Sequence, residues 1–165
     1  MISLIIKQQK EFTKRLFLEN TFDSFEVIQC IFRTHVTYRI DGQTLKDYYG
    51  TGDETAGIPD YISWEKIRPI CFSMIKGNRL PLSFHISLKA NEAMMKEVSE
   101  SFDLNTLGSV PDGLVWNVFY KDGLMRITTS VSYSQFSPDK SAENIWDKYF
   151  IALMDFHEID YSMEL

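Results

Sequence analysis

Cysteine is scarce in this sequence, and long apolar runs are lacking. Cys30 and Cys71 are the only two cysteines, both lie in apolar segments, and they form no C-x-x-C pair. We interpret both as reduced thiols of the core, which excludes a disulfide scaffold. No run reaches the roughly 20 apolar residues of a membrane helix, and the apolar opening, residues 1–6, is too short for the core of a signal peptide. We therefore expect a cytoplasmic protein without a membrane partner.

The strong signatures of catalysis are also missing. The sequence has no G-x-x-x-x-G-K-[ST], no G-x-S-x-G and no H-E-x-x-H motif. Residues 50–52 read Gly-Thr-Gly, but Asp53 and Glu54 follow directly and would repel a phosphate. Histidine occurs three times with no pair at helical spacing, at His35, His85 and His157. We therefore predict no metal, no cofactor and no catalytic residue.

Hydrophobic and aromatic residues are plentiful. They make up 44% and 14% of the 165 residues, and 24% are charged, which is an ordinary globular composition. This supply of apolar surface is enough for one core without a disulfide or a metal. We expect a single domain over residues 1–165.

The net charge of −6 hides an uneven distribution of charge. Residues 61–90 carry one acidic residue, Glu65, against five basic ones, namely Lys66, Arg68, Lys76, Arg79 and Lys89. An acidic protein does not coat nucleic acid in general, but a local basic patch stays possible in this segment. The basic side of the helix expected over residues 8–18 is interpreted as a solvated face; it holds Lys7, Lys10, Lys14 and Arg15.

The centre of the chain combines a helix and a strand. Five apolar residues share helical spacing and predict one buried face, at Ile67, Ile70, Cys71, Met74 and Ile75. Because proline is unfavourable inside a helix, we predict that the helix starts near Pro69 after a turn. The strand that follows alternates apolar and polar residues, with Leu82, Phe84, Ile86 and Leu88 on its buried side.

Other segments predict two hairpins and further helices. The stronger hairpin spans residues 114–133 and turns at Asp122-Gly123, with Lys121 opposite Leu124. A second turn is expected at Asp41-Gly42, with a weak return strand. Residues 2–6 predict an edge strand, residues 91–102 a helix capped by Asn91, and the last helix opens at Ser137 or Ser141. The tail from residue 157 is expected to fray.

One cluster mixes an aromatic residue with cations. Its members are the candidate ligand-binding residues Trp64, Lys66, Arg68, Lys76 and Arg79. If the start of the helix and the turn after it border one cleft, they could hold an anionic or planar ligand. The alternative is that these cations are solvated or paired with the acidic C-terminal half.

The same segment carries a resemblance to a known family. Tyr38-x-Ile40-Asp41-Gly42 is followed by Ser63-Trp64-x-x-x-Arg68-Pro69-x-x-Phe72-x-x-Ile75-Lys76-Gly77-x-x-x-Pro81-x-x-Phe84. This combination resembles a family of short, uncharacterised bacterial proteins known only as a domain of unknown function. The resemblance covers nearly the whole chain, and Lys76-Gly77 with Pro81 is its most distinctive part. It implies a single domain and transfers no activity.

We predict an α+β fold with a mostly antiparallel sheet of five to six strands and four helices chiefly on one face. The leading functional hypothesis is a non-catalytic binding or regulatory module for an anionic small molecule or an acidic protein surface. Such a module would have a pocket lined by Phe or Tyr with convergent Arg or Lys. A small enzyme would instead need a cleft with a perturbed histidine or carboxylate. A nucleic-acid-binding protein would need its cations on one continuous face.

Overall fold

The computed structural model describes residues 1–104 and 110–165, and it contains one antiparallel sheet packed against helices. The sheet has seven strands in the order β3-β2-β4-β5-β6-β1-β7. The strands are β1 (Ser3–Ile6), β2 (Phe25–Arg33), β3 (Thr37–Asp41), β4 (Ser83–Ala90), β5 (Gly113–Lys121), β6 (Leu124–Ser132) and β7 (Tyr161–Met163). The α-helices are α1 (Gln9–Phe17), α2 (Trp64–Ile75), α3 (Glu92–Phe102) and α4 (Ser141–Phe156), and two short 3-10 helices are η1 (Lys46–Tyr49) and η2 (Gly52–Thr55).

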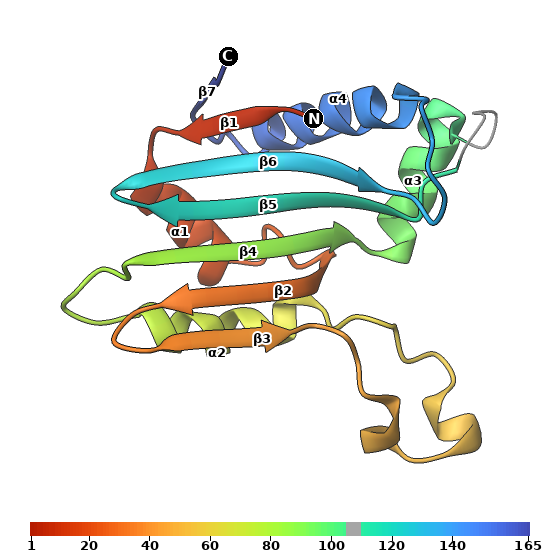
Figure 1. The fold of residues 1–165 in the computed structure, drawn as a ribbon, viewed down its shortest axis with the longest axis horizontal. Coiled ribbons are helices and arrows are strands. Elements are labelled where there is room, and N and C mark those ends of the chain that lie inside the picture. Colours follow the sequence, from red (N-terminus) through yellow and green to blue (C-terminus); the bar gives the residue numbers. More distant parts are fainter. Residues whose placement is uncertain (105–109) are drawn as a thin grey trace.

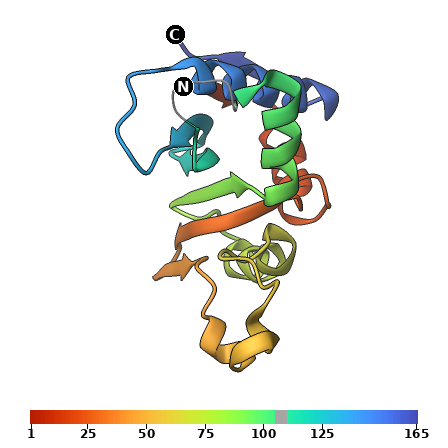
Figure 2. The same ribbon diagram turned by 90° about the vertical axis from the view of Figure 1, so that its right-hand side faces the viewer.

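The α-helices lie against one face of the sheet, and within residues 1–104 and 110–165 the other face carries no helix (Figures 1 and 2). This arrangement confirms the predicted α+β class, with one strand more than expected. The core lies between the two layers. It is built from alternate residues of the central strands, such as Phe84, Ile86 and Leu88 of β4, together with the inward faces of the helices.

The β5/β6 hairpin has the register that the sequence predicts. Lys121 pairs with Leu124 and Tyr120 with Met125, so the apolar residues of both strands share one face. Asp122 and Gly123 have φ values of 52° and 76°. A two-residue turn with positive φ at both positions matches the twist of the strands it joins, which is why Asp-Gly favours it.

The predicted turn at Asp41-Gly42 is wrong. The chain reverses earlier, at residues 34–36, where Thr34 N donates to Val36 O, and β2 pairs directly with β3. The residues after Gly42 are too polar to form a return strand, whereas residues 37–41 bring Tyr38 and Ile40 back to the core. Gly42 is needed for close approach: a Cβ there would lie 1.8 Å from Val27 O.

Helix α2 starts five residues before the position that the sequence predicts. It begins at Trp64 and includes Pro69, because the first turn buries the Trp64 side chain completely. That burial offsets the hydrogen bond that Pro69 cannot donate. At about 100° per residue, Ile70 lies about 120° from Trp64 around the helix. Ile70 is therefore half exposed, and the buried stripe runs through Trp64, Cys71 and the partly buried Ile75.

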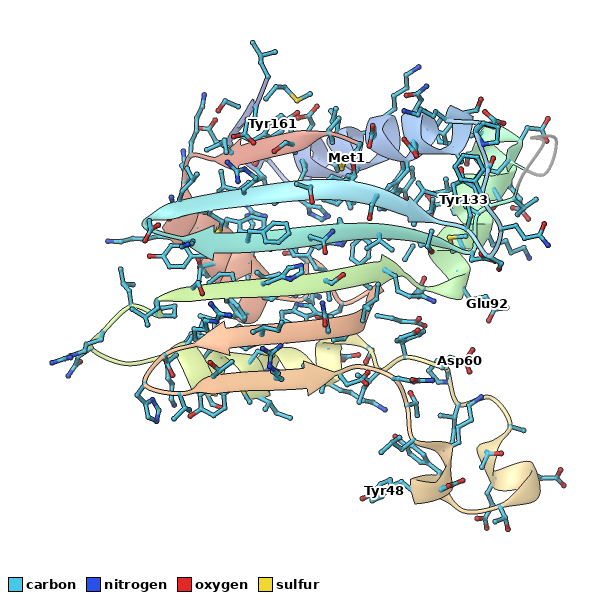
Figure 3. The ribbon with its side chains drawn as sticks, in the orientation of Figure 1. Met1, Tyr48, Asp60, Glu92, Tyr133 and Tyr161 are labelled. Carbon is cyan, nitrogen blue, oxygen red and sulfur yellow. The ribbon has the colours of Figure 1, made fainter. Side chains whose placement is uncertain are left out.

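The ends of the sheet also differ from the sequence expectation. Residues 161–163 form β7, which pairs with β1, so the tail does not fray and β1 is not an edge strand. Tyr161 lies beside β1 in Figure 3 and pairs with Ile6. The segment is too short to be detected from alternation, because a three-residue strand shows less than two periods. Leu82 was expected in the core but lies before β4 and is exposed.

The cap of α3 gives a testable prediction. The Asn91 side-chain oxygen accepts a hydrogen bond from Met94 N at 2.8 Å, as the sequence indicates for an N-cap. Asn91→Ala removes this acceptor, and we expect the free energy of unfolding to fall by about 1 kcal/mol. Urea unfolding of the two chains measures the difference. Asn91→Asp, which keeps the acceptor, serves as the control and should stay close to the wild-type value.

His157, directly after α4, gives a prediction about pH. Its ring contacts Phe22 and Phe156, with centroid distances of 6.2 and 5.1 Å. Burial, and next the positive charge of Arg15, lower the pKa of His157 below its ordinary value of 6.5. The unfolded chain therefore binds the proton more readily. The stability that the neutral ring contributes is present above pH 6.5 and is lost as the pH falls through the lowered pKa.

Unfolding measured in urea from about pH 8 to about pH 5 should therefore show a decline in stability on acidification that is smaller in His157→Gln. The comparison of the two chains removes the contribution of every other titrating group. An equal decline in both chains would contradict this role for His157.

Candidate functional site

A groove opens at one end of the sheet, where α1 begins and α2 ends. Its volume is about 940 Å³. The lining comes from four places in the sequence: residues 7–13, the last turn of α2, the turn at residues 76–81, and the adjoining ends of β4, β5 and β6. We call this cavity the α1/α2 groove. The elements that line it meet at the left end of the sheet in Figure 1, where the turn before β4 projects.

The floor of the α1/α2 groove is apolar and aromatic. It is formed by Phe72, Ile75, Pro81, Phe84, Tyr120 and Met125, and the exposed Leu80 also lines the cavity. The rings of Phe84 and Tyr120 stack at 5.3 Å, and Phe84 also meets the edge of the buried Phe17. Such ring contacts fix the floor in place, so the cavity exists before any ligand arrives.

The rim of the α1/α2 groove is cationic. Lys7, Lys10, Lys76 and Arg79 line it, all of them exposed. Lys7 approaches Asp160 at 3.8 Å in an exposed pair, which contributes little. Within residues 1–104 and 110–165, no ion pair involves the other three. The single acidic residue of the lining, Glu11, lies 3.5 Å from Arg15 Nε. The rim therefore carries a net positive charge.

Two of the five candidate residues predicted from the sequence meet in this groove, namely Lys76 and Arg79. Trp64 is fully buried, and its indole N–H donates to Leu16 O at 2.8 Å. That carbonyl belongs to the last turn of α1, where a helix leaves its carbonyls without internal donors. Trp64 therefore joins α1 and α2 inside the fold. Lys66 is exposed on α2 and lies outside the groove lining.

Arg68 also lies outside the groove. Its guanidinium donates two hydrogen bonds to the Asp23 carboxylate, at 2.8 and 3.0 Å, and both side chains are largely buried. These hydrogen bonds raise the pKa of the Arg68 guanidinium above its usual range. The bidentate pair holds α2 against the chain segment before β2. Arg68 is thus paired, as the alternative expectation allowed, but its partner comes from the N-terminal half.

The contribution of α1 to the groove was not predicted from the sequence. Lys7 and Lys10 were assigned to a solvated helix face, and they are exposed, but the same face borders a cavity. Their spacing gives no sign of this. The cavity depends on α1 packing beside the end of α2, a contact between segments about 60 residues apart in the sequence.

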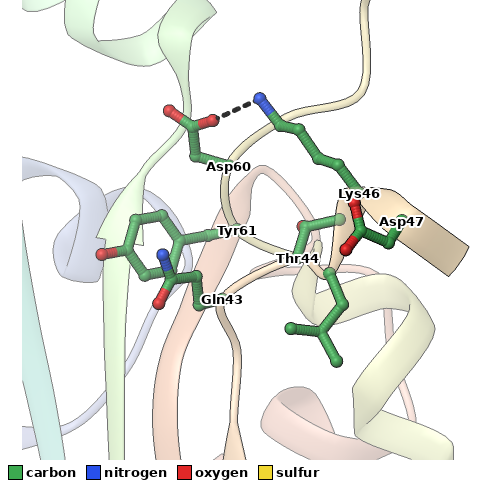
Figure 4. Close-up of a pocket in the computed structure, with 7 residues that line it drawn as sticks. Gln43, Thr44, Lys46, Asp47, Asp60 and Tyr61 are labelled. Atoms are coloured by element: carbon green, nitrogen blue, oxygen red, sulfur yellow. Dashed lines mark ion pairs between the residues drawn. The ribbon is translucent and has the colours of Figure 1, made fainter. Parts of the chain in front are cut away.

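A second cavity, of about 520 Å³, lies between residues 43–47 and residues 60–61 (Figure 4). Two of its three charged groups satisfy each other: Lys46 Nζ lies 2.9 Å from Asp60, and this contact lowers the Asp60 pKa. Of its lining residues, Leu45 is strongly exposed and only Thr44 and Tyr61 are partly buried. This cavity has no buried floor, and its one charge outside a described ion pair is Asp47, whereas the α1/α2 groove combines a packed aromatic floor with several cations. The α1/α2 groove is therefore the stronger site.

The histidines lie away from the α1/α2 groove. His85 is on the face of the sheet without helices, where its ring stacks on Phe119 at 4.3 Å and its Nε2 bonds Asn117 at 3.0 Å. In the part of the chain that the structure describes, no group of three or more His, Cys, Asp or Glu residues could hold a metal ion. Nor does any described helix combine the length and apolar character that a bilayer crossing requires.

Comparison with known proteins places the chain in a family. Residues 15–162 match the family described as "Family of unknown function (DUF5721)", which covers most of the chain, including Lys76, Arg79 and the whole groove floor. The protein belongs to this family. No curated protein and no solved structure matches it.

Proposed function

We propose that this protein is a non-catalytic binding module whose α1/α2 groove takes a small amphipathic anion, with an apolar body and a phosphate or carboxylate head. The observation that carries the proposal is an aromatic floor and a cationic rim in one cavity, with Lys10, Lys76 and Arg79 in no ion pair among the described residues. Reduced, buried Cys30 and Cys71 support a cytoplasmic setting for this binding.

The apolar part of the ligand follows from the floor. Most of the exposed surface inside the groove is apolar, and its rings are held by packing rather than by a ligand. A hydrocarbon chain or ring laid on Phe84 and Tyr120 would gain about 0.8 kcal/mol for each buried methylene group. An inorganic anion alone would gain nothing from this surface.

The charge of the ligand follows from the rim. Lys10, Lys76 and Arg79 surround an apolar cavity, where a charge-assisted hydrogen bond is stronger than in open water. Arg79 can offer two parallel N–H donors to a phosphate or carboxylate, and the lysines add positive charge around it. A cationic ligand would be repelled, and a neutral one would leave the rim without partners.

Binding rather than catalysis is supported by the composition of the lining. The groove contains no histidine and no cysteine, and its one carboxylate, Glu11, faces Arg15. General acid–base chemistry needs a group whose pKa is tuned close to neutrality and that reaches the substrate. The lining residues supply charge and apolar surface instead.

Calorimetric titration with octyl phosphate tests the proposal, with octanol and inorganic phosphate as matched half-ligands. We expect octyl phosphate to bind with 1:1 stoichiometry and at least about tenfold more tightly than either half-ligand, because only the whole molecule uses both floor and rim. Equal binding of octyl phosphate and octanol, or no saturable binding of octyl phosphate, would overturn the proposal.

A further inference from the structure

Residues 44–60 form a protruding arm between β3 and α2. The arm contains η1 and η2 and extends away from the sheet (Figure 1). Its base is closed by a hydrogen bond from Thr44 N to Asp60 O at 2.8 Å and by the bridge between Gln43 and Tyr61. The arm is therefore anchored to the fold at its base, and among the described residues the backbone hydrogen bonds within residues 45–59 stay inside the arm.

The arm presents apolar side chains to solvent. Leu45 is 77% exposed and Tyr48 is 87% exposed, and the ring of Tyr49 meets Tyr48 edge-on at 5.4 Å. Figure 3 places Tyr48 on the arm, outside the outline of the sheet. Exposed tyrosines gathered on a protrusion are typical of residues that become buried in an interface, because tyrosine supplies a large contact area at a low entropic cost.

The charge of the arm complements the α1/α2 groove. Lys46 is neutralised by Asp60, which leaves Asp47, Asp53 and Glu54 as the remaining charges of the arm, and none of the described ion pairs involves them. The arm is thus acidic and aromatic, whereas the groove has a cationic rim and an apolar floor. These are the properties that we assign to the ligand of the groove.

An arm does not reach the groove of its own chain. The groove lies at the end of the sheet where α1 starts and α2 ends, and the arm projects from the region where β3 ends and α2 starts (Figure 1). Both are fixed to the same sheet through hydrogen-bonded strands. An arm that occupies a groove must therefore come from a second copy of the chain.

We propose that the arm of one copy binds in the α1/α2 groove of a second copy, with Leu45 and Tyr48 on the apolar floor and the arm carboxylates at the cationic rim. The inference rests on the proposed function, since it gives the groove a second occupant of the same chemistry. The arm and a small amphipathic anion then compete, and the ligand controls assembly. The contact closes as a two-fold dimer where each arm occupies the other copy's groove, and it continues into a ring or an open chain where the exchange is not reciprocal.

Sedimentation of the full chain at increasing concentration tests this proposal. We expect the average mass to rise to that of a dimer or beyond, and excess octyl phosphate to return it to that of the monomer. The double variant Leu45→Ser and Tyr48→Ser should weaken association by about tenfold or more. A matched control, Val36→Ser with Ile70→Ser, removes two exposed apolar residues elsewhere and should associate as the wild type does.

Engineered cysteines locate the contact. A chain with Thr51→Cys, on the arm, is mixed under oxidising conditions with a chain carrying Gln8→Cys, at the groove. The native cysteines, Cys30 and Cys71, are fully buried, so they do not form disulfides with the engineered cysteines. We expect a disulfide-linked mixed dimer in this mixture. In the control mixture, Lys148→Cys, at an exposed position on α4, replaces Gln8→Cys, and little mixed dimer should form.

The outcomes separate this inference from the proposed function. A wild-type chain that stays monomeric at millimolar concentration overturns the arm contact, and so does an arm double variant that associates as well as the wild type. Octyl phosphate binding by the arm double variant tests the groove alone. Suppose that the arm double variant does not bind octyl phosphate while the wild type associates through its arm. The groove is then an interface between copies only, and the proposed ligand-binding function is wrong.

Discussion

Reversing both groove cations, in the double variant Lys76→Glu and Arg79→Glu, is expected to weaken octyl phosphate binding by about 100-fold or more. Both residues line the rim of the α1/α2 groove, and no ion pair with them occurs in the described parts of the chain. Each charge-assisted hydrogen bond to a ligand contributes about 1.5–3 kcal/mol. Losing two, and placing negative charge beside the phosphate, accounts for this factor. Calorimetric titration measures it.

A matched control separates local contact from net charge. The double variant Lys66→Glu and Lys148→Glu changes the total charge equally, but both lysines are exposed and lie outside the groove lining. We expect only a small loss of affinity in this control, and less at higher salt, because charges farther away than a Debye length are screened. Equal losses in the two double variants would show that the groove cations have no specific role.

Replacing Trp64 with alanine is expected to lower the free energy of unfolding by about 3–5 kcal/mol. The side chain is fully buried and its ring lies 5.8 Å from that of Phe17. Its indole N–H is also the donor for Leu16 O at the end of α1. Alanine leaves a cavity between α1 and α2 and a buried carbonyl without its donor. Chemical denaturation of the two chains measures the loss.

A second substitution divides this loss into packing and hydrogen bonding. Trp64→Phe keeps an aromatic ring and removes the N–H donor, so a smaller loss of about 1–3 kcal/mol is expected. Because Trp64 lies outside the groove, folded Trp64→Phe should bind octyl phosphate with wild-type affinity. Weak octyl phosphate binding by a folded Trp64→Phe chain would instead show that Trp64 belongs to the ligand site, as the sequence alone suggested.

The sequence predicts local structure well where the pattern and the turn chemistry agree. The β5/β6 register follows from one Asp-Gly dipeptide between two alternating runs, and the α3 cap follows from Asn91. Both depend on residues close together in the sequence. The start of α2 was predicted wrongly because the local rule, the penalty for Pro69, is outweighed by the burial of Trp64 against α1. Only the three-dimensional structure contains that contact.

In the candidate site, too, residues close together in the sequence could be predicted, and residues brought together by the fold could not. Lys76 and Arg79 could be selected from the sequence because they flank one turn, and they do share a cavity. The α1 side of the rim and the stacked pair Phe84 and Tyr120 could not be selected, because strand order and helix placement bring them there. Trp64 and Arg68 were included for their chemical type. The structure gives each a partner inside the fold, Leu16 O and Asp23.

Titration of the isotope-labelled protein with octyl phosphate, followed through the backbone amide resonances, shows whether the α1/α2 groove is the binding site. We expect saturable shifts at the start of α1, the last turn of α2 and the turn at residues 76–81, with the amides of α3, at the opposite end of the sheet, unchanged. Shifts confined to α3, or to the second cavity at residues 43–47, would contradict this assignment of the binding site.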